Sequence, residues 1–237
     1  MQRYLKLIHF CIVKFGTELK GSPITKMANE LVRNIRFHNV KFHCYTDDEK
    51  GLDSRFNIYR LSEEDREKHI HWNMMKFFDS SFINAFSDDY TIYMDIDMVW
   101  NKPSLPIVQR EVLQNELLGI HRHWQNLELK DDCPFHDSFL KFKSDDFKFI
   151  HDRYFSYHEY YQGKYYRNGI VEKPRYGVQN FIWETAQEAG MKISYLPSSW
   201  VMKSHIEKYK IYADQYRINT GQDYFEDFDE AILHYYT

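Results

Sequence analysis

The sequence lacks several features that would assign it directly to a class of protein. Its three cysteines, Cys11, Cys44 and Cys133, have no CxxC spacing, so neither a disulfide framework nor a cysteine zinc site is expected. The net charge is −4 and no basic block occurs, so nothing favours nucleic-acid binding. No apolar run approaches the length of a membrane span, and the first residues contain no small-residue signal cleavage site. These absences predict a protein with reduced thiols in the cytoplasm.

Aromatic side chains, by contrast, are abundant. They make up 18% of the 237 residues, with 19 Tyr and 18 Phe. Core packing accounts for many of them, and we assign Trp72 to this group, but flat rings are also surfaces on which sugars and bases stack. A chain of this length fits one α/β domain with a sizeable core.

The first half of the chain alternates strand-like apolar runs with helical patterns. Strands are expected at residues 4–13, 41–45, 56–61, 90–94, 117–121 and 138–142, and helices at residues 24–35, 73–86 and 178–189. Ser144, followed by Asp145 and Asp146, is expected to cap a further helix. Because a strand, a helix and a second strand of these lengths form a right-handed crossover, the pattern predicts an α/β sandwich with a partly parallel sheet.

The most informative segment is YTIYMDIDMVW. Tyr90–Met94 is almost wholly apolar and rich in aromatic and β-branched residues, which is typical of a strand buried on both faces. Asp95 and Asp97 follow it, and residues i and i+2 of an extended chain share a face. Two carboxylates that project the same way favour a cation between them, and oxygen ligands favour Mg²⁺, Mn²⁺ or Ca²⁺. Asp88 and Asp89, before the strand, are expected to face solvent.

Polar residues follow several of the expected strands at the point where each strand ends. They are Lys14-Phe15-Gly16, Thr46-Asp47-Asp48, Asp95-Ile96-Asp97, His121-Arg122-His123 and His234. In open α/β sheets, ligands bind beyond the carboxyl ends of the strands. Together these residues predict one cleft that contains a metal, an acidic rim facing a nucleoside, and basic groups.

Six ordered segments carry a resemblance to a known family. FHCYTDD, WNMMKF, YTIYMDIDMV, DSFLKF, YGVQNFIW and AILH resemble the motifs of small GT-A-fold glycosyltransferases of bacterial and phage type, distantly glycogenin-like. The resemblance runs from about Leu5 to His234. It implies a Rossmann-like α/β/α sandwich of GT-A type with a mixed, mostly parallel central sheet. It also implies one catalytic domain over residues 1–237, with a nucleotide-binding half at 1–100 and an acceptor-side half at 101–237.

The resemblance also implies an activity and a cofactor. Members of this family transfer a sugar from a nucleotide diphosphate sugar, here most simply a UDP-sugar, to a hydroxyl of a saccharide or another acceptor. Their DxD carboxylates hold Mn²⁺ (or Mg²⁺), which bridges the donor diphosphate. Asp95, Asp97 and His234 are therefore the implied metal ligands, with Asp97 the firmer one. The resemblance further implies that Asp95 touches the ribose and that Ile96 also belongs to the nucleotide site.

The other family positions fall on residues around the same expected cleft. The implied nucleotide contacts are Lys14, Phe15, Gly16, Thr46, Asp48 and Lys76. Gln179, in a segment that resembles the family's GDQD motif, is implied to lie near the donor sugar and the acceptor. An inverting reaction needs a carboxylate within reach of the acceptor hydroxyl, and Asp137 is the candidate. A retaining reaction needs no base beyond the leaving phosphate.

The chain departs from the family pattern at two places. Gly and then Lys-Pro usually follow the family's histidine, where the lysine contacts the diphosphate, whereas Tyr235-Tyr236-Thr237 stands here. The cations that could replace that lysine are Lys76, Arg175 and Lys203. Both acids of the GDQD motif are also replaced, by Val178 and Asn180.

Two other functions fit part of the sequence. In haloacid-dehalogenase-type phosphatases an apolar strand precedes Asp-X-Asp, and Asp95 would then be the nucleophile. That motif normally lies on the first strand, whereas here about ninety residues precede it. The second alternative is a non-catalytic protein that binds carbohydrate with Ca²⁺, although the segment lacks the glycine and spaced acids of a calcium loop.

Overall fold

The structure is a computed structural model, and it describes most of the chain. The described residues are 6–15, 28–29, 39–67, 70–96, 98–100, 105–122, 133–167, 177–204 and 233–236. Of the helix expected at 24–35, only Ala28 and Asn29 lie within these ranges, and both are helical. Within these ranges, no helix is both long enough and apolar enough to span a membrane.

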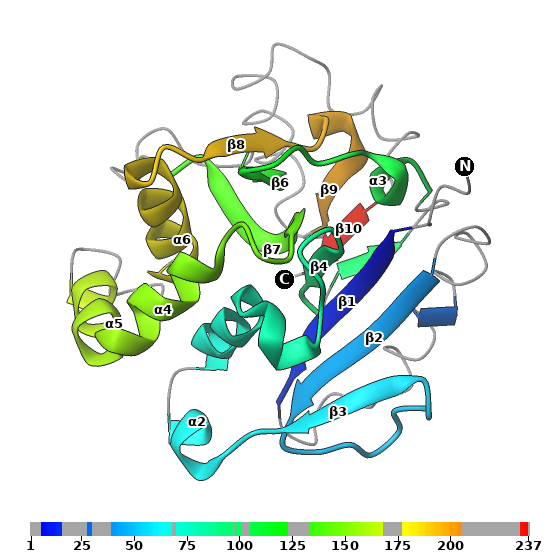
Figure 1. Cartoon of the computed structure of the whole chain (residues 1–237), viewed down its shortest axis with the longest axis horizontal. Helices are drawn as coiled ribbons and strands as arrows, with labels where there is room; N and C mark the ends of the chain where they lie inside the picture. Colours follow the sequence, from blue (N-terminus) through cyan, green and yellow to red (C-terminus); the bar gives the residue numbers. More distant parts are fainter. Residues whose placement is uncertain are drawn as a thin grey trace.

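A seven-stranded sheet forms the centre of the molecule (Figure 1). Its strands, in spatial order, are β3 (Phe56–Arg60), β2 (Asn39–Thr46), β1 (Leu7–Lys14), β4 (Tyr90–Met94), β7 (Phe135–Lys143), β6 (Glu116–His121) and β8 (Lys192–Tyr195). Neighbouring strands are parallel except at β7, which is antiparallel to both β4 and β6. The prediction of a mixed, mostly parallel central sheet is therefore confirmed.

A second, smaller sheet begins where β4 ends. Its three strands, in spatial order, are β5 (Met98–Trp100), β10 (Leu233–Tyr236) and β9 (Val201–Ser204). Figure 1 shows β9 and β10 side by side near the middle of the molecule. The chain thus passes from the central sheet into the small one through the Asp95–Met98 segment, and this passage brings the C-terminal strand next to that segment.

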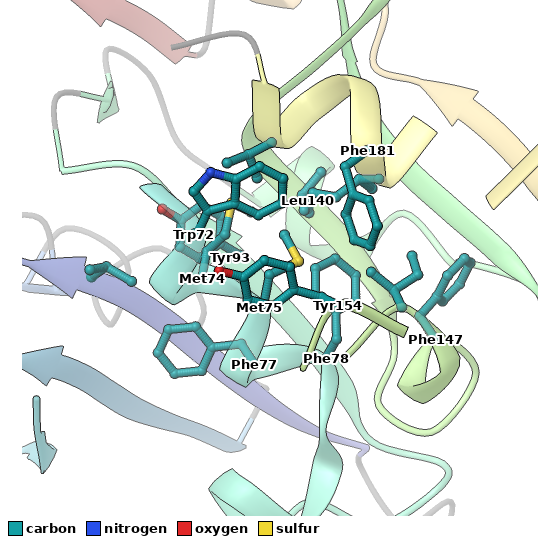
Figure 2. Close-up of a cluster of buried hydrophobic side chains, with 14 of the residues drawn as sticks. Trp72, Met74, Met75, Phe77, Phe78, Tyr93, Leu140, Phe147, Tyr154 and Phe181 are labelled. Carbon is teal, nitrogen blue, oxygen red and sulfur yellow. The ribbon is translucent and has the colours of Figure 1, made fainter. Parts of the chain in front are cut away.

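One face of the central sheet is covered by helices, which lie mainly to one side of β1–β3 (Figure 1). These are η1 (Ile70–Phe78), η2 (Ser80–Ile83), α4 (Lys148–Ser156), α5 (His158–Arg167) and α6 (Gly177–Glu188). Their apolar side chains pack onto Cys11, Tyr93 and Leu140 of the sheet, as Figure 2 shows for part of this cluster. Trp72 is 1% exposed and stacks on Tyr154 at 4.8 Å between ring centroids, so its assignment to the core is confirmed.

The other face of the sheet has its own apolar core. Alternate residues of each strand point to it, for example Phe10 of β1 and Ile92 of β4, and α3 (Leu105–Gln109) packs there. Strand β4 is therefore buried on both faces, as its composition predicted. Lys141, a buried lysine on β7, binds the C-terminal end of α3. Its side-chain nitrogen donates hydrogen bonds to the carbonyl oxygens of Val108 (2.6 Å) and Arg110 (2.5 Å).

Two local predictions are wrong. Ser144 does not cap a helix: α4 begins at Lys148 without a side-chain cap. The Ser144 hydroxyl instead bonds the Thr91 hydroxyl at 2.8 Å, so it is used to tie β4 to the chain that leaves β7. The helix expected over residues 73–86 is two 3-10 segments, η1 and η2, because Asp79 stops the first and caps the second. The short α2 (Glu63–Glu67) precedes them.

Candidate active site at the carboxyl ends of the strands

The ends of β1, β2 and β4 meet at one edge of the central sheet. Lys14 pairs with Thr46 in the parallel β1–β2 ladder, and Cys11 pairs with Tyr93 in the parallel β1–β4 ladder. Adjacent strands lie about 4.8 Å apart, so Lys14 and Thr46, which end β1 and β2, lie at nearly the same level as Asp95, which follows β4. The structure therefore brings together the strand ends that the sequence singled out.

Lys14 and the turn after β2 form a tightly bonded unit. The Lys14 side chain is fully buried, and its ammonium donates a hydrogen bond to the Asp48 carbonyl oxygen at 2.6 Å. The same nitrogen lies 3.4 Å from the Asp48 carboxylate. The Thr46 hydroxyl accepts from the Asp48 backbone N–H at 3.0 Å, which closes the turn. The Lys50 backbone N–H and the nearby Lys14 ammonium lower the pKa of Asp48, so this carboxyl stays ionised at neutral pH.

Asp95 lies in a turn rather than in an extended segment. The Met98 N–H donates to the Asp95 carbonyl oxygen at 3.2 Å, which closes a four-residue turn. The chain at Asp95 and Ile96 is therefore not extended as the sequence predicted, and whether Asp95 and Asp97 share a face stays a prediction. The turn arises because β5 leaves the central sheet to pair with β10. Asp97 lies outside the described residues.

A tyrosine fixes the carboxylate of Asp95. The Tyr93 hydroxyl donates to Asp95 Oδ1 at 2.6 Å, and Asp95 itself is half-buried. Sequence analysis did not single out Tyr93. The signal was present, because Tyr93 and Asp95 are two residues apart at the end of a strand and so can share its face.

Strand β7 bulges where it pairs with β6, and Asp137 is one of the bulged residues. Leu118 of β6 pairs with Lys141 of β7, and Ile120 pairs with His136, so β7 has extra residues between these two pairs. On its other side, the Ser138 carbonyl oxygen accepts from the Asp95 N–H at 2.8 Å, and Asp137 precedes Ser138. Gly119 permits the bulge, because a Cβ at this position would collide with the Phe135 ring. Bulges of this kind are frequent next to active sites, where they re-aim side chains.

Gln179 lies in the first turn of α6. Its side chain is fully buried, and its amide nitrogen and oxygen have no hydrogen-bond partner within the described ranges. The helix start is tightly packed, since a Cβ on Gly177 would lie 3.2 Å from the Cβ of Tyr165. A buried amide without partners is costly unless a ligand satisfies it, so this amide fits a site for a polar ligand.

The remaining predicted residues are placed less directly. The Lys76 ammonium lies 4.4 Å from the centre of the Phe155 ring, so it faces α4, and its contact with a nucleotide stays a prediction. Phe15 is half-buried just after β1 and packs against the apolar cluster between the helices and the central sheet, here called the helical-face core. Gly16 lies outside the described residues. The backbone of His234 pairs with that of Val99, two residues after Asp97, which puts the C-terminal strand next to the DxD segment.

The end of β6 contributes a buried basic group. Arg122 is 3% exposed and its guanidinium donates to the Cys133 carbonyl oxygen at 3.0 Å, so it ties β6 to the segment before β7. His121 packs edge-on against Tyr195, and burial lowers its pKa. His123 lies outside the described residues. Basic groups thus reach this edge as expected, but Arg122 is engaged with the protein backbone.

Of the three implied metal ligands, only the Asp95 side chain lies within the described residues. Asp95 offers a hard carboxylate oxygen at the end of a buried strand, and the β5–β10 ladder brings the backbones of the DxD segment and His234 together. Carboxylate and imidazole donors suit Mn²⁺ better than they suit a soft-ligand site. Within the described ranges, no group of three His, Cys, Asp or Glu side chains forms a metal cage. Two of the three implied ligand side chains, those of Asp97 and His234, fall outside what is described.

Comparison with known proteins gives one kind of match. No family model and no curated protein sequence matches the chain. Among solved structures, the galactosyltransferase LgtC in complex with donor and acceptor sugar analogs is similar, with a TM-score of 0.57 at 11% identity over 96% of this chain and 86% of that one. Mouse xyloside xylosyltransferase 1 matches with a TM-score of 0.51 at 11% identity over 97% of both chains.

Two further similar structures extend the range of organisms. The glycosyltransferase GlyE of Streptococcus pneumoniae TIGR4 gives a TM-score of 0.55 at 10% identity, over 98% of this chain and 55% of that one. A glycosyltransferase involved in glycosylation of the major capsid of PBCV-1 gives 0.53 at 9% identity, over 96% and 92%. At these sequence identities the structural similarity shows the fold alone. The chain therefore has the GT-A fold of glycosyltransferases, as its ordered motifs implied.

Proposed function

We propose that this protein is a metal-dependent glycosyltransferase that moves a sugar from a UDP-sugar to a hydroxyl acceptor. The observation that carries the proposal is the meeting of Asp95, the Lys14–Asp48 turn and the β7 bulge at one edge of a GT-A sheet. Ligands of open α/β sheets bind at this edge. The similar structure of LgtC holds donor and acceptor sugar analogs, which supports the same class of substrates here.

Asp95, Asp97 and His234 are the residues that would hold Mn²⁺ or Mg²⁺. When bound, the cation supplies Lewis-acid neutralisation of the charge that develops on the departing nucleoside diphosphate. The protein's own contribution is to hold the Asp95 carboxylate in place before the donor arrives. The Tyr93 hydroxyl and the backbone bond to Ser138 do this.

The turn at Thr46–Asp48 forms the nucleoside side of the site. Its shape is set by the buried Lys14 ammonium and by the Thr46 hydroxyl, so it does not need to be ordered when the donor binds. Pre-ordering of this kind lowers the entropic cost of binding. In this assignment Lys14 acts through Asp48, and Phe15, Gly16 and Ile96 are further proposed nucleotide contacts. Lys76 is the proposed cation for the diphosphate.

Gln179 and Asp137 form the proposed reaction side of the site. The unpartnered Gln179 amide is suited to sugar hydroxyls, because it offers both a donor and an acceptor in a buried place. The similar structure of LgtC was also solved as an active-site mutant in which glutamine is replaced by glutamate, so a glutamine belongs to the active site of that protein. Asp137 is 8% exposed, and we assign it to accept the proton of the acceptor hydroxyl if the reaction inverts.

The test is a screen of nucleotide sugars for Mn²⁺-dependent hydrolysis or transfer. We expect activity with at least one UDP-sugar, loss of that activity with EDTA, and loss in an Asp97→Asn variant that keeps its fold. Full activity of Asp97→Asn would overturn the metal site. The phosphatase alternative makes a different prediction, because fluoroberyllate with Mg²⁺ would then raise the melting temperature more than UDP with Mn²⁺ does. Ca²⁺-dependent glycan binding without any nucleotide effect would favour the non-catalytic alternative.

A further inference from the structure

The contact between Tyr93 and Asp95 has the properties of a built support rather than of a chance surface contact. The donor–acceptor distance of 2.6 Å is typical of a hydroxyl that donates to an ionised carboxylate. Such hydrogen bonds are stronger than neutral ones and fix the geometry of both groups. Asp95 has few side-chain torsions, so one bond to Oδ1 goes far towards fixing the orientation of the whole carboxylate.

The Tyr93 ring is itself held firmly. It is 5% exposed, and it belongs to the helical-face core drawn in Figure 2. Its centroid lies 6.2 Å from that of Phe77 on η1, and its backbone pairs with Cys11 on one side and Leu140 on the other. A ring in such surroundings does not change rotamer cheaply, so its hydroxyl is a fixed donor.

The backbone of Asp95 is fixed as well. Its N–H donates to the Ser138 carbonyl oxygen at 2.8 Å and its carbonyl oxygen accepts from the Met98 N–H at 3.2 Å. Both backbone groups and one carboxylate oxygen are therefore in place without any ligand.

We propose that Tyr93 is a positioning residue that orients the Asp95 carboxylate for the divalent cation. The inference rests on the proposed function, because it assumes that Asp95 is a metal ligand. Partners that hydrogen-bond to metal ligands typically contribute 10- to 100-fold to metal affinity. Loss of the Tyr93 hydroxyl should therefore weaken cation binding while the fold, which depends on the ring, is retained.

The experiment measures Mn²⁺ binding directly, by electron paramagnetic resonance of the free ion, with saturating UDP and the full chain. Tyr93→Phe removes one oxygen and keeps the ring that packs on Phe77. Tyr154→Phe is the matched control, since it removes a hydroxyl from the same core whose partner is Gln162, at 2.6 Å. We expect the Mn²⁺ dissociation constant to rise about tenfold in Tyr93→Phe and less than twofold in Tyr154→Phe.

A second variant keeps the proposal open to refutation if Tyr93→Phe does not fold. Asp95→Glu keeps the charge but moves the carboxylate one methylene away from the Tyr93 hydroxyl, and it should also weaken Mn²⁺ binding about tenfold. Thermal unfolding without metal separates a loss of stability from a loss of affinity in each variant.

The outcomes separate the inference from the function beneath it. Wild-type protein that binds no Mn²⁺ in the presence of UDP would overturn the proposed function and this inference together. Wild-type protein that binds Mn²⁺, with unchanged affinity in Tyr93→Phe or in Asp95→Glu, would overturn only the role of Tyr93. A lowered melting temperature with unchanged Mn²⁺ affinity would show that the hydroxyl is merely structural.

Discussion

The two ends of β4 carry two aspartates with different surroundings. Asp89, just before the strand, is 7% exposed, and its Oδ2 accepts from the Phe86 N–H at 2.9 Å and lies 3.3 Å from His9 Nε2. Asp95, just after the strand, is half-buried, and its Oδ1 accepts from Tyr93. Both carboxylates are thus fixed by the protein, but they lie at opposite edges of the same parallel strands.

Asp89 ends a chain of polar groups that runs through the interior. His9 Nδ1 lies 2.9 Å from His43 Nε2, and His43 Nδ1 lies 3.1 Å from the Tyr59 hydroxyl. One arrangement of protons satisfies every member: Tyr59 donates to His43, His43 donates to His9, and His9 donates to Asp89. Both histidines are then neutral. Burial lowers the pKa of His9 and lowers that of His43 to about 3, which agrees with this arrangement.

The difference between the two acids shows how a buried carboxylate is assigned a role. The polar groups from Asp89 to Tyr59 satisfy one another's hydrogen bonds within the protein. Asp89 lies at the amino edge of the parallel strands, whereas ligands of open α/β sheets bind at the carboxyl edge. Asp95 lies at the carboxyl edge, the same edge as the turn after β2, and its N–H donates to Ser138 of β7. We therefore assign Asp89 to stability and Asp95 to catalysis, and the following variants test that division.

The largest effect is expected for activity at Asp95. Asp95→Asn keeps the size of the side chain but removes the charge that a divalent cation requires, so transfer from the nucleotide sugar should fall by at least about a hundredfold. The melting temperature should change little, because the amide oxygen still accepts from Tyr93. Steady-state kinetics with Mn²⁺ and thermal unfolding together check this, and an active Asp95→Asn variant would contradict the assignment.

At the other end, the expected loss is in stability. Asp89→Ala leaves the Phe86 N–H and the buried His9 nitrogen without their acceptor, which should lower the free energy of unfolding by about 2–4 kcal/mol. The kcat of the folded fraction should remain unchanged. Urea unfolding and kinetics measure the two quantities separately. A variant of normal stability with lost activity would reverse the division between the two ends.

Asp89 also marks where sequence reasoning failed. Residues 88–89 were expected to face solvent, which is correct for the exposed Asp88 and wrong for Asp89. The burial of Asp89 depends on His9, which lies on a strand 80 residues away along the chain. No local pattern reports such a partner, because Asp-Asp before a strand is equally compatible with a solvated turn.

The parts of the fold that could be predicted are those set by local composition. Tyr90–Met94 forms a strand buried on both faces, and α6 ends before Gly190, whose φ of +69° suits glycine. The turn at Asp95 and the bulge at Asp137 could not be predicted. Each depends on which strand pairs with which: β5 with β10 for the turn, and β6 with β7 for the bulge.

An intermediate effect is expected from pH at the His9–His43 pair. The folded pKa of His43 is depressed below the unfolded value of about 6.5, so its contribution to stability is complete above pH 6.5 and is lost as pH falls towards about 3. Within this window the free energy of unfolding should fall by about 1.4 kcal/mol per pH unit for this one proton.

A variant isolates that pH effect from the titration of surface carboxylates. His43→Phe keeps an aromatic ring between His9 and Tyr59, which stack on it at 5.0 and 5.7 Å between centroids. Urea unfolding between pH 7 and pH 4.5 should show a shallower decline in the variant than in the wild type. Parallel declines would mean that His43 is protonated in the folded protein and that the proposed arrangement of protons is wrong.

The smallest effect is expected at Asp88, and it makes the comparison between the two ends sharpest. Asp88 is exposed and adjoins Asp89, so it shares the position in sequence but not the burial. Asp88→Asn should leave activity unchanged and alter the free energy of unfolding by less than about 0.5 kcal/mol, as is usual for surface positions. Kinetics and urea unfolding of this variant, beside Asp89→Ala, would show that burial and the bond to His9, rather than an acidic residue before β4, make the difference. A large loss of activity in Asp88→Asn would instead place the reaction at the amino edge of the strands, and Asp95 would then lose its role.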